Sequence, residues 1–293
     1  MPATSANLGT GFDSVGLALS IYNYLEIKEG TDNGEKVVIH GPAGVPVGED
    51  NLIYRTISDF FKWAGKEMPP LTMWQNDHIP MTRGLGSSAA CVVSGLMAGN
   101  ALAEMDLSRE DLIQMAAQIE GHPDNSTPAL IGGLTVGAMT EERLEYVRLP
   151  DESWKALKFA LMVPAFELST EKARALLPEE YPRRDVVHNT ARVALLMASL
   201  MAGDFQKLFY ALDDRIHQPY RSHLVPDMDV IFEEARKNGA YNAFLSGAGP
   251  SLIAVTEDEG FILKMTEFLR KLPNNWAVSW VAPDYEGATI QGS

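Results

Sequence analysis

Apolar and polar residues follow one another along this chain in two kinds of pattern. Short runs of apolar and β-branched residues, set between turn residues, predict strands at 15–24, 37–39, 159–164, 243–245 and 252–255. Residues 1–9 contain Gly, Ser and Asn without such a run. We therefore expect the chain to begin in a loop and to lack a first strand.

Helices are predicted where apolar residues recur at every third or fourth position, at 51–64, 89–105, 108–118, 187–201, 205–212 and 230–237. In the first of these segments Ile53, Ile57 and Phe61 share one face, and a Pro-Pro pair at 69–70 follows it. Ser108 with Asp111 three residues later is typical of a helix N-terminus. The helices and strands are mixed along the chain, which predicts an α+β fold.

The length of the chain and a pause in its pattern predict two lobes. Domains cluster at about 100–150 residues, and this chain has 293. The apolar periodicity stops between 150 and 157 and resumes with the strand at 159–164. We place the lobes at 1–150 and 151–293.

Charge and composition narrow the class of partner. The chain has 39 acidic and 24 basic residues, a net charge of −15, which repels phosphate backbones and anionic lipid surfaces. No stretch has the roughly 18 apolar residues of a membrane span, and the N-terminus lacks a secretion pattern. The single cysteine, Cys91, lies among small and apolar residues, which predicts a buried thiol. We expect a cytoplasmic protein with neither nucleic acid nor membrane as a partner.

The segment 80–90 is a glycine turn that leads directly into a predicted helix of small residues. Glycines allow an anion to approach the backbone, and the free N–H groups and dipole of a first helical turn attract it. A plain helix cap is the alternative, because Gly and Ser are common at helix starts. No Lys follows the second Gly, so this is not the common P-loop. The candidate phosphate-binding residues are Pro80, Thr82, Arg83, Gly84, Leu85, Gly86, Ser87, Ser88, Ala89 and Ala90.

This loop resembles the signature loop of the galactose, homoserine, mevalonate and phosphomevalonate kinases. The segments 2–13 (PATSANLGTGFD) and 120–125 (EGHPDN) resemble motifs of the homoserine kinases within that superfamily, and 246–251 (SGAGPS) resembles its shared C-terminal glycine motif. Thr10 departs from the family pattern, which more often has proline there. Together the motifs cover residues 2 to 251.

The resemblance implies a fold and an activity. The fold is the two-lobe α+β fold of the homoserine and mevalonate kinases, with a nucleotide-binding N-terminal lobe and the active site in the cleft between the lobes. The activity is ATP-dependent phosphorylation of the side-chain hydroxyl of L-homoserine, a step toward threonine, with Mg²⁺ as cofactor. The family is commonly dimeric, so the resemblance also suggests a homodimer.

The resemblance also assigns the catalytic residues. Ser88 and Glu120 match metal-contacting positions, although a terminal Glu of a helix is more often solvated. Several relatives have an aspartate base where this chain has Asn125, and an amide cannot take a proton. The catalytic set is therefore Asn125, Glu120 and Ser88, with direct attack by the substrate hydroxyl.

Homoserine carries an ammonium and a carboxylate, which require complementary charges. Asp13 is the candidate for the ammonium, and Arg174 and Arg221 match positions that hold the carboxylate. For either arginine alone, a solvated surface charge is the alternative. The remaining substrate candidates from the motifs are Asn7, His122, Asn125, Thr170 and Gly249.

Several of these polar residues also have simpler explanations. His122 could instead bond within its turn, and Asp124 is expected to bond its own backbone. His217 and His188 are weaker candidates still.

Two other functions remain open from the sequence. One is a kinase of the same superfamily that acts on an isoprenoid or sugar alcohol, which would more often have Asp at position 125. The other is a ligand sensor on the same fold, in which loss of Glu120 or damage to the phosphate loop would be expected. Both features are intact.

Overall fold

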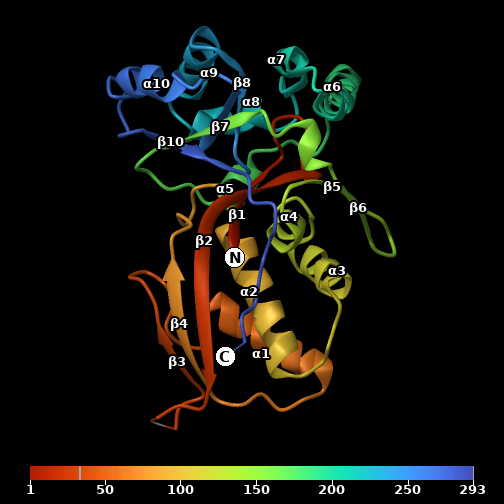
Figure 1. Cartoon of the computed structure of the whole chain (residues 1–293), viewed down its shortest axis with the longest axis vertical. Coiled ribbons are helices and arrows are strands. Elements are labelled where there is room, and N and C mark those ends of the chain that lie inside the picture. Colours follow the sequence, from red (N-terminus) through yellow and green to blue (C-terminus); the bar gives the residue numbers. More distant parts are fainter. Residues whose placement is uncertain (33, 293) are drawn as a thin grey trace.

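The computed structural model describes residues 1–32 and 34–292 and contains two sheets, one in each half of the chain (Figure 1). The first is a six-stranded sheet in the order β3-β4-β2-β5-β6, with β1 paired to β2. Its strands are β1 (Pro2–Ala6), β2 (Val15–Glu29), β3 (Val37–His40), β4 (Leu71–Asp77), β5 (Leu134–Met139) and β6 (Leu144–Arg148).

Four helices accompany this sheet and pack against one another beside it: α1 (Leu52–Ala64), α2 (Ser87–Leu102), α3 (Arg109–Glu120) and α4 (Ser126–Ile131). Local sequence explains their ends. The side chain of Asn51 accepts hydrogen bonds from the first turn of α1, and Gly65 ends that helix in a left-handed conformation. Ser108 and Asp111 form a reciprocal capping box at the start of α3.

The second sheet has four strands in the order β10-β7-β9-β8. These strands are β7 (Lys158–Val163), β8 (Ala240–Leu245), β9 (Leu252–Thr256) and β10 (Ala277–Val281). The helices of this half are α5 (Thr170–Ala175), α6 (Arg183–Ala202), α7 (Leu208–Ala211), α8 (Gln218–Arg221), α9 (Met228–Lys237) and α10 (Phe261–Leu269). Short 3₁₀ turns cover Asp151–Ser153, Phe205–Lys207 and Ser222–Leu224.

One apolar core joins the two sheets. Leu17 and Leu19 of β2 belong to the same buried cluster as Phe159 of β7 and Phe244 of β8. After β10 the chain returns along the first half (Figure 1). The backbone N–H of Ala288 donates to the carbonyl of Ala129 at 2.8 Å. The boundary near residue 150 stays a prediction, and the C-terminal segment packs across it.

The structure confirms most of the predicted elements and corrects three. The expectation that the chain lacks a first strand is wrong, because Pro2–Ala6 pairs antiparallel with β2. The predicted strand 15–24 continues to Glu29 because β4 pairs with its second half. The predicted helix 205–212 divides into a 3₁₀ turn and the one-turn helix α7. Among the described residues, no helix is long and apolar enough to span a membrane.

Candidate active site

The predicted phosphate loop connects the end of β4 to the first turn of α2, and both halves of the molecule hold it. The N–H of Thr4 in β1 donates to the carbonyl of Leu85 at 3.1 Å. The hydroxyl of Ser246 donates to the carbonyl of Gly84 at 2.6 Å. The N–H of Leu168 donates to the carbonyl of Thr82 at 3.0 Å. The two glycine motifs, far apart in sequence, therefore form one turn structure.

The glycines of this loop are required by close packing. Gly84 and Gly86 have φ angles of 72° and 71°. A Cβ at Gly84 would lie 2.2 Å from the carbonyl oxygen of Ser246, and one at Gly86 would lie 1.9 Å from the hydroxyl of Thr4. The backbone of the loop is therefore fixed, as a preorganised anion site requires.

The first turn of α2 offers its backbone N–H groups and the exposed side chain of Ser88. Gly86 precedes Ser87, the first helical residue, so the N–H groups that follow lack intrahelical acceptors. Leu85, Ala89 and Ala90 are buried, so they can meet a nucleotide only through backbone atoms. Ser88 is exposed at the helix start. The side chain of Arg83 turns away toward the carbonyl of Ala165 at 2.8 Å.

Glu120 is a half-buried carboxylate at the C-terminal end of α3. This helix packs against α2. Burial raises the pKa of Glu120; His122 acts next and opposes this rise, and the charge of Asp124 adds to it more weakly. Among residues 1–32 and 34–292, no hydrogen bond or ion pair engages its carboxylate. A carboxylate without a protein partner, together with a hydroxyl such as that of Ser88 on the neighbouring helix, fits the oxygen donor set of Mg²⁺.

Cys91, one turn into α2, is a free thiol, but it is only partly buried, whereas the sequence predicted a buried one. Burial raises the pKa of Cys91 to about 12, assisted by the charges of Asp77 and Glu120. The thiol therefore stays protonated and unreactive at neutral pH.

The turn between α3 and α4 brings three polar side chains together. Nδ1 of His122 lies 2.6 Å from Oδ1 of Asp124, which is itself buried. This bond raises the pKa of His122. The hydroxyl of Thr4 donates to Oδ1 of Asn125 at 2.8 Å. The expectation that Asp124 bonds only its own backbone is therefore wrong, since its carboxylate orients His122.

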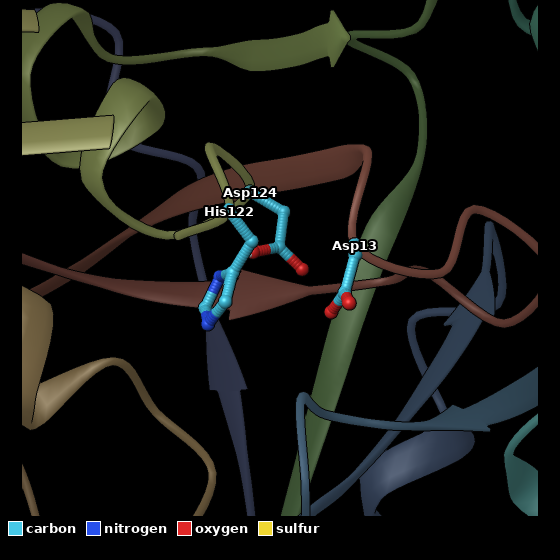
Figure 2. A group of neighbouring side chains, drawn as sticks. All are labelled: Asp13, His122 and Asp124. Atoms are coloured by element: carbon cyan, nitrogen blue, oxygen red, sulfur yellow. The ribbon is translucent and has the colours of Figure 1, made fainter. Parts of the chain in front are cut away.

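Asp13 faces this turn from the loop between β1 and β2 (Figure 2). Ligand atoms of Asp13, His122 and Asp124 lie within 4.8 Å of one another, a spacing that could suit a metal ion. However, both carboxylate oxygens of Asp13 accept hydrogen bonds from Arg174 at 2.9 Å, and Asp124 already holds His122. A guanidinium in contact with the group disfavours a second cation, so we assign no metal to it.

Arg221 on α8 is only 2% exposed and has neutral partners. It donates to the carbonyl of Gly247 at 3.0 Å and to that of Ala173 at 3.4 Å, and Nη1 lies 3.2 Å from Nδ1 of His217. Among the described residues, no carboxylate lies within ion-pair distance of it.

Arg221 nevertheless keeps its charge. Burial, and secondly the charge of Arg174, lower the pKa of Arg221 to about 10. It is still protonated at neutral pH. The site therefore contains a buried cation that forms no direct ion pair, although the charges of Asp13, Asp214 and Asp124 act on it from a greater distance. An anionic ligand would supply the missing direct contact.

Comparisons with known proteins identify the family of this chain. The models of the GHMP kinases N terminal domain and the GHMP kinases C terminal match residues 51–133 and 196–273. A homoserine kinase from Clostridium acetobutylicum is 41% identical over 99% of this chain and 98% of its own length. One from Caldicellulosiruptor saccharolyticus is 40% identical over 99% and 95%. The chain belongs to the homoserine kinase family.

Solved structures place the fold in the same group. The homoserine kinase from Cytophaga hutchinsonii superposes with a TM-score of 0.85 at 26% identity, covering 98% of this chain and 94% of that one. A mevalonate kinase from L. major, in complex with R-mevalonate, has a TM-score of 0.72 at 17% identity, covering 98% and 95%, which shows a shared fold alone. The two-lobe α+β kinase fold expected from the motifs is thus confirmed.

In this homoserine kinase fold, the remaining substrate candidates lie around Asp13 and Arg221. Asn7 is buried, accepts from the N–H of Asp13 at 3.0 Å and donates to the carbonyl of Gly247 at 3.0 Å. Its side chain therefore shapes the site from behind. Thr170 is the exposed first residue of α5, the helix that carries Arg174. Gly249 packs against the side chain of Leu245.

Sequence reasoning missed two residues of the candidate site, Thr4 and Phe12, and gave too little weight to a third, His217. Thr4 holds both the phosphate loop and Asn125. Phe12 lies under both guanidinium groups, 5.7 Å from Arg174 and 5.4 Å from Arg221. His217, a weak candidate from sequence, is fully buried against Arg221. The sequence did offer a signal for each of them, because Thr4 and Phe12 lie within the N-terminal motif and His217 lies shortly before Arg221.

Proposed function

We propose that this enzyme transfers the γ-phosphoryl group of ATP to the side-chain hydroxyl of L-homoserine, giving O-phospho-L-homoserine and ADP. The observation that carries the proposal is the buried Arg221, whose protein partners are all neutral, close to the carboxylate of Asp13. Homoserine supplies the missing anion through its carboxylate, and its ammonium suits Asp13.

Homoserine has to open the ion pair between Asp13 and Arg174 in order to bind. This pair is partly exposed, so its opening costs little, because water can solvate the separated charges. The ammonium of the substrate takes the place of the guanidinium at Asp13, and the released Arg174 joins Arg221 at the carboxylate. Binding thus replaces one ion pair within the protein by two between the protein and homoserine.

The nucleotide is held mainly by backbone groups. The phosphates lie against the turn 84–86 and the N–H groups of the first turn of α2, where the helix dipole adds about half a positive charge. This local arrangement is what a chain of net charge −15 needs, because its overall field repels ATP. Mg²⁺, when bound by Ser88 and Glu120, offsets the charge of the phosphate oxygens.

The chemical step is a direct displacement. The substrate hydroxyl oxygen forms a bond to the γ-phosphorus as the bond from that phosphorus to the bridging oxygen breaks, and ADP leaves. The proton of the hydroxyl passes to a phosphate oxygen or to solvent. Asn125, whose amide oxygen is occupied by Thr4, can donate a hydrogen bond but cannot act as a base. It therefore positions the hydroxyl.

The charge pattern also separates homoserine from the other substrates of this fold. Mevalonate has a carboxylate for Arg221 but no ammonium for Asp13, and galactose has neither group. The product fits threonine biosynthesis, as the family resemblance suggests. A cytoplasmic location and a homodimer stay predictions.

A coupled ADP-release assay with homoserine, mevalonate, galactose and shikimate tests the function. We expect turnover with homoserine. Turnover only with another of these alcohols would overturn the proposal.

The substrate clamp has its own test. Loss of one partner of a buried charge pair costs on the order of 2–5 kcal/mol, so Arg221→Leu should lower kcat/KM for homoserine by roughly thirtyfold to several thousandfold. The KM for ATP should barely move. Arg184→Leu, at an 82% exposed side chain on α6, is the matched control and should behave as the native enzyme. An equal loss of ATP affinity in Arg221→Leu would assign this arginine to the nucleotide instead.

A further inference from the structure

His217 occupies a position behind the proposed substrate site that neither motif nor mechanism has used. Its side chain is fully buried just before α8. Nε2 lies 2.7 Å from the carbonyl oxygen of Gly9, and Nδ1 lies 3.2 Å from Nη1 of Arg221. Its ring stacks on that of Phe12, with centroids 5.2 Å apart.

These two contacts define the protonation of the imidazole. A carbonyl oxygen only accepts hydrogen bonds, so the proton must lie on Nε2. A guanidinium only donates, so Nδ1 must present its lone pair to Arg221. Both contacts are satisfied together by one form of the ring, the neutral Nε2–H tautomer.

The surroundings stabilise that neutral form. Burial is the largest influence and lowers the pKa of His217. Asp214, whose Oδ2 lies 3.7 Å from Nε2, acts next and raises it, the charge of Arg221 then lowers it, and the Gly9 carbonyl and Asp13 raise it more weakly. The carboxylate of Asp214 is already occupied by the N–H groups of His217 and Gln218, at 2.9 and 2.7 Å. The imidazole is therefore neutral at pH 7.

The two partners of His217 belong to opposite ends of the proposed substrate site. Gly9 lies in the loop that carries Asp13, the residue expected to meet the ammonium. Arg221 is the residue expected to meet the carboxylate. A single rigid ring therefore connects the elements that hold the two charged groups of the ligand.

We propose that His217 is a positioning residue that, as the neutral Nε2–H tautomer, fixes Arg221 relative to the Asp13 loop and thereby sets the affinity for homoserine. The inference rests on the proposed function, since it assumes that Arg221 holds the substrate carboxylate. His217 does not itself touch the substrate.

Two substitutions separate its two contacts. In His217→Gln the amide can still reach the carbonyl of Gly9 but leaves Arg221 without its acceptor. In His217→Asn the shorter amide keeps an oxygen near the position of Nδ1 and loses the contact to Gly9. A hydrogen bond to a charged group is worth enough to change affinity about ten- to a hundredfold.

The experiment measures KM and kcat of the native enzyme and both variants with homoserine, ATP and 3-aminobutan-1-ol, in which a methyl group replaces the carboxylate. We expect His217→Gln to raise the KM for homoserine about tenfold or more while kcat and the KM values for ATP and the amino alcohol stay within about twofold. His217→Asn restores the acceptor for Arg221 but not the link to Gly9, so it should recover only part of the homoserine affinity. In an Arg221→Leu background, His217→Gln should cause little further loss, because the contact is already absent.

The outcomes distinguish the two proposals. If the native enzyme phosphorylates homoserine but His217→Gln matches it, the positioning role is overturned and the function stands. A parallel fall of kcat and of affinity for all three substrates, at unchanged thermal unfolding temperature, would overturn it too, because that describes general disturbance of the site. A native enzyme without homoserine turnover overturns the proposed function itself.

Discussion

At the scale of single residues, the candidate site contains two charged side chains without a direct ion-pair partner among the described residues, the buried Arg221 and the half-buried Glu120. Arg221 bonds only neutral groups, and Glu120 has no hydrogen-bond or ion-pair partner among the described residues. Elsewhere in the site charges are paired, as with Asp13 and Arg174. Because burial of an unpaired charge is costly, we propose that these two positions bind an anion and a cation of the reacting complex.

The first prediction concerns the metal. Glu120→Gln removes the negative charge while it keeps the size of the side chain, so the turnover number should fall by about a hundredfold or more. The KM for homoserine should change little, and raised Mg²⁺ should restore part of the activity. Glu267→Gln, an exposed position on α10, is the control. Unchanged turnover in Glu120→Gln would remove this residue from the metal site.

The second prediction concerns the proton. Asn125→Asp creates a carboxylate where some relatives have a base, but here it would stand directly beside the buried Asp124. We expect no gain in kcat, because the fixed contact with Thr4 already uses the oxygen at this position. The measurement is kcat across the neutral pH range. A gain of several-fold would show that a base at 125 assists the reaction.

At the scale of elements, the phosphate loop is a joint product of three segments. β1, the glycine turn before α2 and the turn 246–251 meet there through backbone and hydroxyl hydrogen bonds. Helix α8 similarly places Arg221 because Asp214 accepts hydrogen bonds at its start. Local sequence forms each element, and the close approach of their backbones forms the site.

The third prediction uses two glycines with similar backbones. Gly84 and Gly65 both have positive φ, at 72° and 64°, so alanine at either costs about 1–2 kcal/mol in backbone strain. A Cβ at Gly65 meets nothing within 4 Å, whereas one at Gly84 would clash with the carbonyl of Ser246.

Gly84→Ala should therefore lower kcat/KM for ATP by about a hundredfold, and Gly65→Ala should lower only the unfolding free energy. Steady-state kinetics and chemical denaturation of both variants provide the check. Equal kinetics in the two variants would mean that the loop tolerates displacement and is not a preorganised anion site.

At the scale of the whole molecule, the N-terminal loop and the C-terminal half are held together by buried polar contacts. Asn189 donates to the carbonyl of Thr10 at 3.2 Å, and the hydroxyl of Thr10 donates to that of Ala211 at 2.8 Å. His217 adds its bond to Gly9. Protonation of a group in this interface therefore affects the stability of the entire fold.

The fourth prediction is the pH dependence of that stability. In the unfolded chain His217 takes up a proton below about pH 6.5, whereas in the folded chain its lowered pKa delays uptake. Its contribution is fully present above pH 6.5 and is lost as the pH falls toward the folded pKa, at up to about 1.4 kcal/mol per pH unit.

Denaturant unfolding of the native enzyme and of His217→Asn at several pH values between 7.5 and 5 tests this dependence. The native enzyme should lose its stability advantage over the variant as the pH falls. A difference that stays constant across this range would contradict the assignment of a buried neutral imidazole.

The sequence by itself determined the elements and chemistry that depend on neighbouring residues. The apolar face and caps of α1, the capping box of α3 and the glycine turn before α2 are local patterns. The motifs also identified Asp13, Glu120 and Arg221 as candidates, and the structure gathers Asp13 with Arg174 and brings Arg221 beside the same Phe12 ring.

Only the tertiary structure decided which charges are paired, which are buried and which are held by a third residue. The bonds from Thr4 to Asn125, from Arg174 to Asp13 and from His217 to Gly9 join residues 121, 161 and 208 positions apart. The first strand was missed for the same reason, because its short polar sequence is stabilised by pairing with β2. Such contacts depend on burial and on partners distant in the chain, and no local pattern specifies either.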